Sequence, residues 1–254
     1  MAGLVDPLLK LDWAKRHLDA LDSLLQSFID GGEGTSYTCS RYDDLEHQEH
    51  VLEVRLADIP DPICLTAGDA LYCMRSSLDQ LVWSLASAPG GLGSPERTQF
   101  PVICKDDSKR RKRFADQTAG VPALAITEIK AFQPYHRGAS YKSHPLWRLN
   151  AMCNLDKHRR IPANGSELEI YFPGTVQAHV KQETTSDCHI LRVPLARKHE
   201  LQFKLPPTFQ VNFGGGDPMT DPSALLETVN GFREMHQFIA ENVLPRFIKF
   251  FPGT

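Results

Sequence analysis

The stretch LYCMRSSLDQLVW (residues 71–83) places an arginine, an aspartate and a glutamine inside an otherwise apolar helical run. Apolar residues recur here at intervals of three and four, the spacing of one buried helix face. They are Leu71, Met74, Leu78, Leu81 and Leu85. A separate polar stripe consists of Asp69, Tyr72, Ser76 and Asp79, and Trp83 continues it. Arg75 and Asp79 stand four apart and can pair on one face. Two interpretations stay open: an ion pair that ties the core together, or a site that faces a pocket.

The flanking segments predict a helix, a hairpin and the helix just described. Residues 6–30 carry apolar side chains at helical spacing from Leu8 to Phe28, with Pro7 at the first turn and two glycines after the end. Residues 36–60 alternate as two strands of a β-hairpin, which Pro60 and Pro62 end. The helix of the opening stretch is then expected to run from Cys64 to about residue 88.

The remainder changes from helical to strand periodicity near residue 163. Two short helices, a loop at residues 136–144 and a helix that begins at Pro145 are expected first. Residues 163–216 then alternate as four or five antiparallel strands. Residues 222–251 predict a last long helix, bent or ended near Pro245, which packs back onto the first ones. We therefore expect an α+β fold, made of a helical core, an N-terminal hairpin and a C-terminal antiparallel meander, in one composite domain over residues 1–254.

Composition and charge restrict the function classes. The 254 residues are 41% hydrophobic and 23% charged, typical of a globular protein, and the net charge of −3 argues against nucleic-acid binding over the whole surface. No apolar run approaches the roughly 20 residues that span a bilayer, and no signal peptide is evident, so we expect a cytoplasmic protein without a membrane partner. Six scattered cysteines without a C-x-x-C pair indicate reduced thiols rather than a zinc site.

A second polar constellation lies in NAMCNLDKHRR (residues 150–160). Asn150, Asn154 and His158 are spaced by four, and Lys157 lies on nearly the same face. This set could hold a phosphate or a carboxylate, or use His158 as a general acid or base. The alternative is a helix end whose basic side chains complement the macrodipole, which leaves the asparagines unexplained.

The two helices together resemble a family of uncharacterised bacterial proteins. Its members show a glycine–aspartate start and an arginine–serine–x–leucine–aspartate–histidine core before an aromatic residue, then an aspartate–lysine–histidine–arginine segment. The matching positions here are Gly68, Asp69, Arg75, Ser76, Leu78, Asp79 and Trp83, then Asp156, Lys157, His158 and Arg159. The match covers about a fifth of the chain and implies no established activity.

The arginine–histidine spacing of that core is in turn similar to the HEPN superfamily. The resemblance implies a helical, often dimeric protein, and many members are metal-independent endoribonucleases of defence or toxin–antitoxin systems. Their arginine and histidine activate the ribose 2′-hydroxyl. This sequence departs at the decisive position, because Gln80 stands where the histidine would be. Glutamine forms hydrogen bonds but does not transfer protons near neutral pH.

One further feature bears on nucleic acid. Five consecutive basic residues could contact phosphates, although nearby aspartates favour a solvated charge run. They are Lys109, Arg110, Arg111, Lys112 and Arg113. His47 and His50 stand three apart in a predicted strand and so point to opposite faces, which makes them a poor metal chelate.

Two functions follow from these features. The first is a non-catalytic binding or interaction protein with a buried network of Arg75, Asp79 and His158. The alternative is a HEPN-like endoribonuclease or RNA-binding protein in which Arg75 and His158 are catalytic. In either case the expected ligand-binding residues are Asp69, Tyr72, Asp79, Gln80, Asn150, Asn154, Lys157 and Arg159. The partners left open are RNA or a phosphate-bearing ligand and a second copy of the chain, and we expect no metal and no cofactor.

Overall fold

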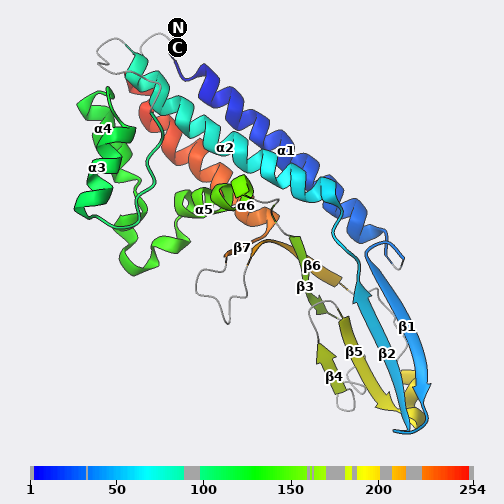
Figure 1. Ribbon diagram of the computed structural model, residues 1–254. Helices are drawn as coiled ribbons and strands as arrows, with labels where there is room; N and C mark the ends of the chain where they lie inside the picture. The colour runs from blue at the N-terminus through cyan, green and yellow to red at the C-terminus, as the bar shows by residue number, and fades with distance from the viewer. Residues whose placement is uncertain are drawn as a thin grey trace. The chain divides into compact units, whose positions relative to one another are not determined.

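The computed structural model describes residues 3–32, 34–88, 98–158, 161, 163–169, 181–184, 188–200, 208–215 and 225–251. The fold is α+β with an N-terminal hairpin, as predicted (Figure 1). The chain divides into two compact units. Unit 1 comprises Met1–Leu21, Cys64–Pro162 and Gly214–Thr254, and unit 2 comprises Asp22–Ile63 and Ala163–Phe213. That the whole chain forms one composite domain stays a prediction. No described helix is both long and apolar enough to cross a membrane.

Three helices lie side by side in unit 1, which holds α1 (Val5–Asp30) as far as Leu21, α2 (Asp61–Ser87) from Cys64 onward, and α6 (Val229–Phe238) (Figure 1). The hydroxyl of Ser77 donates to the carbonyl of Pro7 at 2.7 Å, which joins α2 to α1. His236 Nε2 donates to the carbonyl of Leu11 at 3.0 Å, so the last helix packs back onto the first, as expected. The sequence pattern places Leu8 on the buried face of α1, and this prediction is wrong. Leu8 is 51% exposed, and the neighbouring Pro7 is buried instead.

The C-terminal segment departs from the single helix predicted for residues 222–251. Leu225–Glu227 form a short strand, β7, and α6 begins only at Val229. Thr228 caps α6, because its hydroxyl accepts a hydrogen bond from the Gly231 amide at 3.2 Å. A π-turn at Ile239–Val243 and a 3₁₀ helix at Leu244–Phe250 follow α6. Pro245 lies at the start of this 3₁₀ helix, where its missing N–H costs no hydrogen bond; that the helix bends there stays a prediction.

The middle of unit 1 holds three short helices and one irregular strand-like segment. The helices are α3 (Ser108–Gln117), α4 (Ala123–Ala131) and α5 (Pro145–His158). The prediction of a loop at residues 136–144 is wrong, because Pro134–Ser143 form a 3₁₀ helix. Buried Gln133 holds the irregular residues 99–103 in place: its Oε1 accepts from the Ile103 amide and its Nε2 donates to the carbonyl of Pro101.

Unit 2 is built from antiparallel strands. The hairpin of β1 (Tyr37–Asp44) and β2 (Glu49–Leu56) is confirmed. Its second strand pairs with β5 (Cys188–Pro194), which pairs with β4 (Lys181–Thr184), so the described strands of this sheet follow the order β1-β2-β5-β4. β3 (Ala163–Glu169) pairs separately with β6 (Thr208–Gly215). The strands after residue 163 are therefore divided between two sheets rather than joined in one meander. Residues 201–207 of the region predicted to form strands lie outside the described residues.

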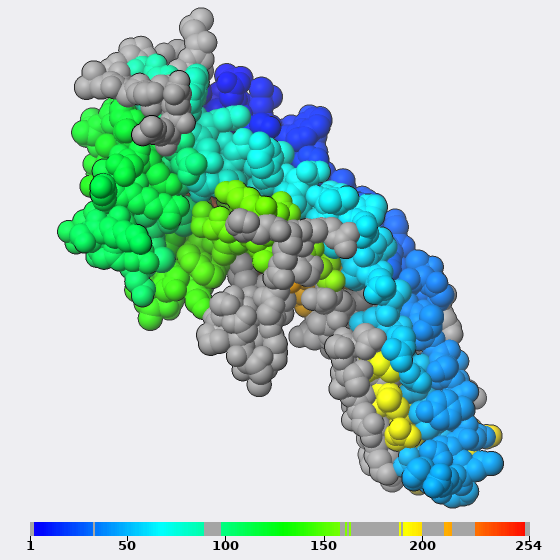
Figure 2. All heavy atoms as spheres, in the orientation of Figure 1, coloured from blue at the N-terminus to red at the C-terminus, as the bar shows by residue number. Residues whose placement is uncertain are grey.

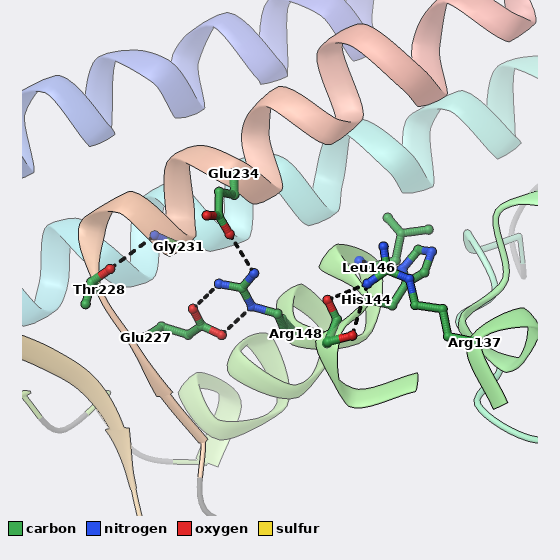
Figure 3. Close-up of polar contacts among 9 residues, drawn as sticks. Arg137, His144, Leu146, Arg148, Glu227, Thr228, Gly231 and Glu234 are labelled. Atoms are coloured by element: carbon green, nitrogen blue, oxygen red, sulfur yellow. Dashed lines mark hydrogen bonds and ion pairs between the residues drawn. The ribbon is translucent and has the colours of Figure 1, made fainter. Parts of the chain in front are cut away.

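One ion-pair network of unit 1 was not predicted (Figure 3). Arg148 of α5 donates from Nε to Glu227 Oε1 at 2.6 Å, from Nη2 to Glu227 Oε2, and from Nη1 to Glu234 Oε2 at 2.9 Å. Glu227 is 5% exposed, whereas the side chain of Glu234 is 66% exposed. The absence of a side chain at Gly231 makes room for this network, since a Cβ there would lie 2.5 Å from Arg148 Nη2 and overlap Glu227.

A buried histidine precedes the same helix. His144 is 7% exposed, and its Nδ1 accepts a hydrogen bond from the Leu146 amide at 3.2 Å (Figure 3). Its ring packs edge-on against Phe238. Burial lowers the pKa of His144 from 6.5 to about 4. The imidazole is therefore neutral in the folded protein at neutral pH and carries its proton on Nε2.

We expect this histidine to make unfolding pH-dependent. The unfolded chain takes up a proton near pH 6.5 and the folded one only near pH 4, so its contribution is complete above pH 6.5 and is lost as the pH falls to about 4. The size of the loss is roughly 3 kcal/mol. Urea denaturation of the native protein and of His144→Asn across this range measures it, because asparagine keeps an acceptor but does not titrate. Identical pH profiles for the two proteins would contradict the assignment.

Candidate ligand-binding pocket between α2 and α5

Helix α2 presents the two stripes that the sequence predicted. The five leucine and methionine residues of the apolar stripe are all fully buried. On the polar stripe, Tyr72 is 64% exposed and Trp83 is 45% exposed. These rings stand eleven residues apart, or three helical turns, and therefore lie on one face about 16 Å from each other. The side chains of Arg75 and Asp79 lie between them and are 13% and 32% exposed.

Arg75 and Asp79 form a pair that also binds the backbone of Phe100. Arg75 donates from Nε to Asp79 Oδ2 at 3.2 Å and from Nη2 to Oδ1 at 2.8 Å. Nη2 donates further to the carbonyl of Phe100 at 2.7 Å, and the Phe100 amide donates to Asp79 Oδ1 at 2.8 Å. Both polar backbone groups of a fully buried residue are thus satisfied by one ion pair. We call these contacts the Phe100 clamp.

The clamp leaves one arginine nitrogen unused. In the described part of the chain, three buried side-chain atoms have no hydrogen-bond partner: Arg75 Nη1, Gln80 Oε1 and Gln117 Oε1. An unsatisfied buried polar atom costs about 1–3 kcal/mol, and more when it is charged. A guanidinium donor and two amide acceptors are therefore available for a bound molecule.

Helix α5 lies close to the N-terminal part of α2, at Gly68. A Cβ on Gly68 would lie 2.9 Å from Asp156 Oδ1, so a larger residue there would displace the Asp156 side chain. Burial, together with the charge of Asp69, raises the pKa of Asp156. The thiol of Cys153 donates to the carbonyl of Leu71 at 3.5 Å. Burial raises the pKa of this thiol to about 12, which makes it a poor nucleophile.

A pocket of about 410 Å³ opens between these helices. Its lining includes Tyr72, Arg75, Gln80, Trp83, Asp156 and Lys157. Figure 2 shows the surfaces of α2 (cyan), α3 (green) and α5 (yellow-green) adjoining on one face of the molecule. This volume falls within the range of small-molecule sites, and exposed rings beside buried polar atoms are typical of their lining. We call it the α2–α5 pocket.

The structure brings most of the predicted site residues together. Tyr72, Arg75, Asp79, Gln80 and Lys157 line the α2–α5 pocket. Asn150 and Asn154 line a smaller space that shares Arg75, Asp79 and Lys157 with it. Asp69 is exposed and lines neither space among the residues described. His158 ends α5, but its side chain and the whole of Arg159 lie outside the described part of the chain.

The five basic residues of α3, Lys109 to Arg113, differ in their contacts. Arg110 pairs with Asp107, and Arg111 pairs with Asp106 at 2.8 Å, so both charges are compensated at the start of the helix. Lys109 and Lys112 are exposed. Arg113 makes no hydrogen bond or ion pair with any described residue and lines the smaller space beside Arg75. The run is therefore not a uniform patch.

Several lining residues were not predicted. Gln99 and Gln117 pair with each other at 3.2 Å and line the smaller space, yet nothing in the spacing of residues 98–117 indicates this. Asp156 was a position of the family resemblance, which is a signal that could have found it. Comparisons with protein-family models, with curated proteins and with solved structures find no match to this chain.

Proposed function

We propose that the α2–α5 pocket binds a ligand that carries a planar aromatic ring, without catalysing its conversion. The observation that carries the proposal is the unpartnered Nη1 of Arg75 and Oε1 of Gln80 in a pocket flanked by two half-exposed aromatic rings. A donor and an acceptor can orient the ligand by hydrogen bonds. Stacking on an exposed aromatic ring contributes about 1–3 kcal/mol per base in single-stranded nucleic acids, and other planar rings are bound in the same way.

The polar residues of the pocket argue against catalysis. Arg75 uses Nε and Nη2 in the Phe100 clamp, where they support the fold. Gln80 cannot accept and return a proton, and the high pKa of Cys153 excludes an activated thiolate there. No histidine is among the described residues that line the pocket. These features support binding over acid–base chemistry.

Adenosine, a neutral molecule with a planar ring, tests the binding proposal. We expect isothermal titration calorimetry to detect binding to the native protein. The double variant Tyr72→Ala/Trp83→Ala should weaken that binding roughly 5- to 150-fold, which corresponds to the loss of about 1–3 kcal/mol of stacking. Tyr42→Ala is the matched control, because Tyr42 is 48% exposed on β1 and does not line the pocket among its described residues. Equal effects of both changes would refute the proposal.

Metal-independent cleavage of RNA is the second candidate. Its support is the resemblance to the HEPN motif, in which Arg75 takes the place of the arginine and Gln80 that of the histidine. His158→Ala is the informative variant, because Arg75→Ala disturbs the clamp and so loses activity for structural reasons. We expect no cleavage of a mixed-sequence RNA by the native protein in EDTA. Cleavage by the native protein that His158→Ala abolishes, with unchanged thermal unfolding, would establish the enzyme instead. Self-association of the chain stays a prediction from the family resemblance.

A further inference from the structure

A small polar space lies directly beside the α2–α5 pocket, and we call it the polar chamber. It has a volume of about 60 Å³, and its lining includes Arg75, Arg113, Gln117, Asn150, Asn154 and Lys157. A cavity of roughly 10–15 Å³ holds one water molecule, so the chamber holds a few. That is also the space required by the four oxygens of a tetrahedral oxyanion.

The chamber is rich in donors that have no partner in the protein. Arg75 Nη1 is buried and unused. Arg113, Lys157, Asn150 and Asn154 line the chamber from α3 and α5 and make no hydrogen bond or ion pair with any described residue; Asn150 is partly buried and the other three are exposed. Three other arginines of α3 and α5, namely Arg110, Arg111 and Arg148, do pair with carboxylates. The unpaired set therefore indicates an anion as the occupant.

The charges around the chamber favour an anion over a cation. Arg75, Arg113 and Lys157 supply three positive charges, and Asp79 is the one described carboxylate in the lining, which leaves a net charge of +2. Both oxygens of Asp79 already accept hydrogen bonds from Arg75 or Phe100. The aspartate is thus neutralised by its own partner and does not repel an anion strongly.

Gln117 distinguishes between kinds of oxyanion. It is 9% exposed, its Nε2 donates to Gln99 Oε1 at 3.2 Å, and its Oε1 is buried without a partner. An unpaired acceptor beside these donors can accept a hydrogen bond from a ligand oxygen that carries a proton. Phosphate monoesters carry such a proton below their second pKa of about 6, whereas sulfate carries none in this range.

From these contacts we infer that the polar chamber is a phosphate subsite and that the ligand of the α2–α5 pocket is a phosphate monoester. The inference rests on the proposed function in one respect, because the ring of the same ligand occupies the adjoining pocket. The two spaces share Arg75, Asp79, Cys153 and Lys157, so a phosphate in the chamber can be joined covalently to a ring in the pocket.

Calorimetric titration with inorganic phosphate tests the subsite by itself. We expect native protein to bind phosphate more tightly than sulfate, and Arg113→Gln to weaken phosphate binding about ten- to a hundredfold, the usual effect of losing a charge-assisted hydrogen bond. Lys112→Gln is the matched control: it removes the same charge from the adjacent exposed residue, which does not line the chamber in the described structure. Absence of phosphate binding, equal weakening by both variants or a preference for sulfate would overturn the inference.

Adenosine and adenosine 5′-monophosphate separate this inference from the proposed function. If both hold, the monophosphate binds more tightly than either adenosine or phosphate, and Arg113→Gln affects it but not adenosine. If adenosine binds as tightly as its monophosphate, the pocket stands and the subsite fails. If phosphate binds and Arg113→Gln weakens that binding, but Tyr72→Ala/Trp83→Ala does not change the binding of adenosine or its monophosphate, the subsite stands and the ring site fails.

Discussion

Replacement of Arg148 by methionine is expected to lower the free energy of unfolding by about 3–5 kcal/mol. Methionine keeps the apolar stem of the arginine but removes all the donors from which Glu227 and Glu234 accept hydrogen bonds. Glu227 is 5% exposed, so its carboxylate would be left in the interior without a counter-charge. Chemical denaturation near pH 7 measures the loss.

Two matched variants separate the buried pair from the exposed one. Glu234→Gln removes the partner that is 66% exposed and should cost no more than about 1 kcal/mol. The double variant Arg148→Met/Glu227→Met removes both buried charges and should regain most of the stability, because an apolar pair of similar volume replaces an ion pair at little cost. A loss for Glu234→Gln as large as that for Arg148→Met would contradict this account of the network.

Replacement of Arg75 by methionine is the second large effect, with an expected loss of about 3 kcal/mol. The Phe100 carbonyl would lose the donor that lies 2.7 Å away, and Asp79 would lose its counter-charge. Thermal and urea unfolding measure the change. Lys157→Met is the control, because Lys157 lines the same pocket but is exposed and makes no hydrogen bond or ion pair with a described residue. A stability unchanged by Arg75→Met would mean that the arginine does not hold the fold and is free for another role.

The helices could be predicted from the sequence because their patterns are local. The apolar stripe of α2 repeats at helical spacing, and the Arg75–Asp79 pair follows from a separation of four residues. The helical spacing of Asn150, Asn154 and Lys157 likewise placed them on one face. Prediction worked where a residue's partner lies within one or two turns of the same helix.

The contacts that complete the site and the fold join residues far apart in the chain, so no local pattern contains them. Phe100 lies 25 residues from Arg75, and Glu227 lies 79 residues from Arg148. β2 pairs with β5 across more than a hundred residues, which alternation alone cannot specify. Arg113 seemed one of five equivalent basic residues, and only the packing of α3 beside α5 distinguishes it.

The most direct test of the ligand site is a crystal structure of the protein with adenosine 5′-monophosphate at saturating concentration. We predict the phosphate in the polar chamber, with Arg75 Nη1 donating to one oxygen and Gln117 Oε1 accepting from another, and the adenine stacked on Tyr72 or Trp83. A chamber that holds only water under these conditions, with the nucleotide absent from the α2–α5 pocket, would contradict the account.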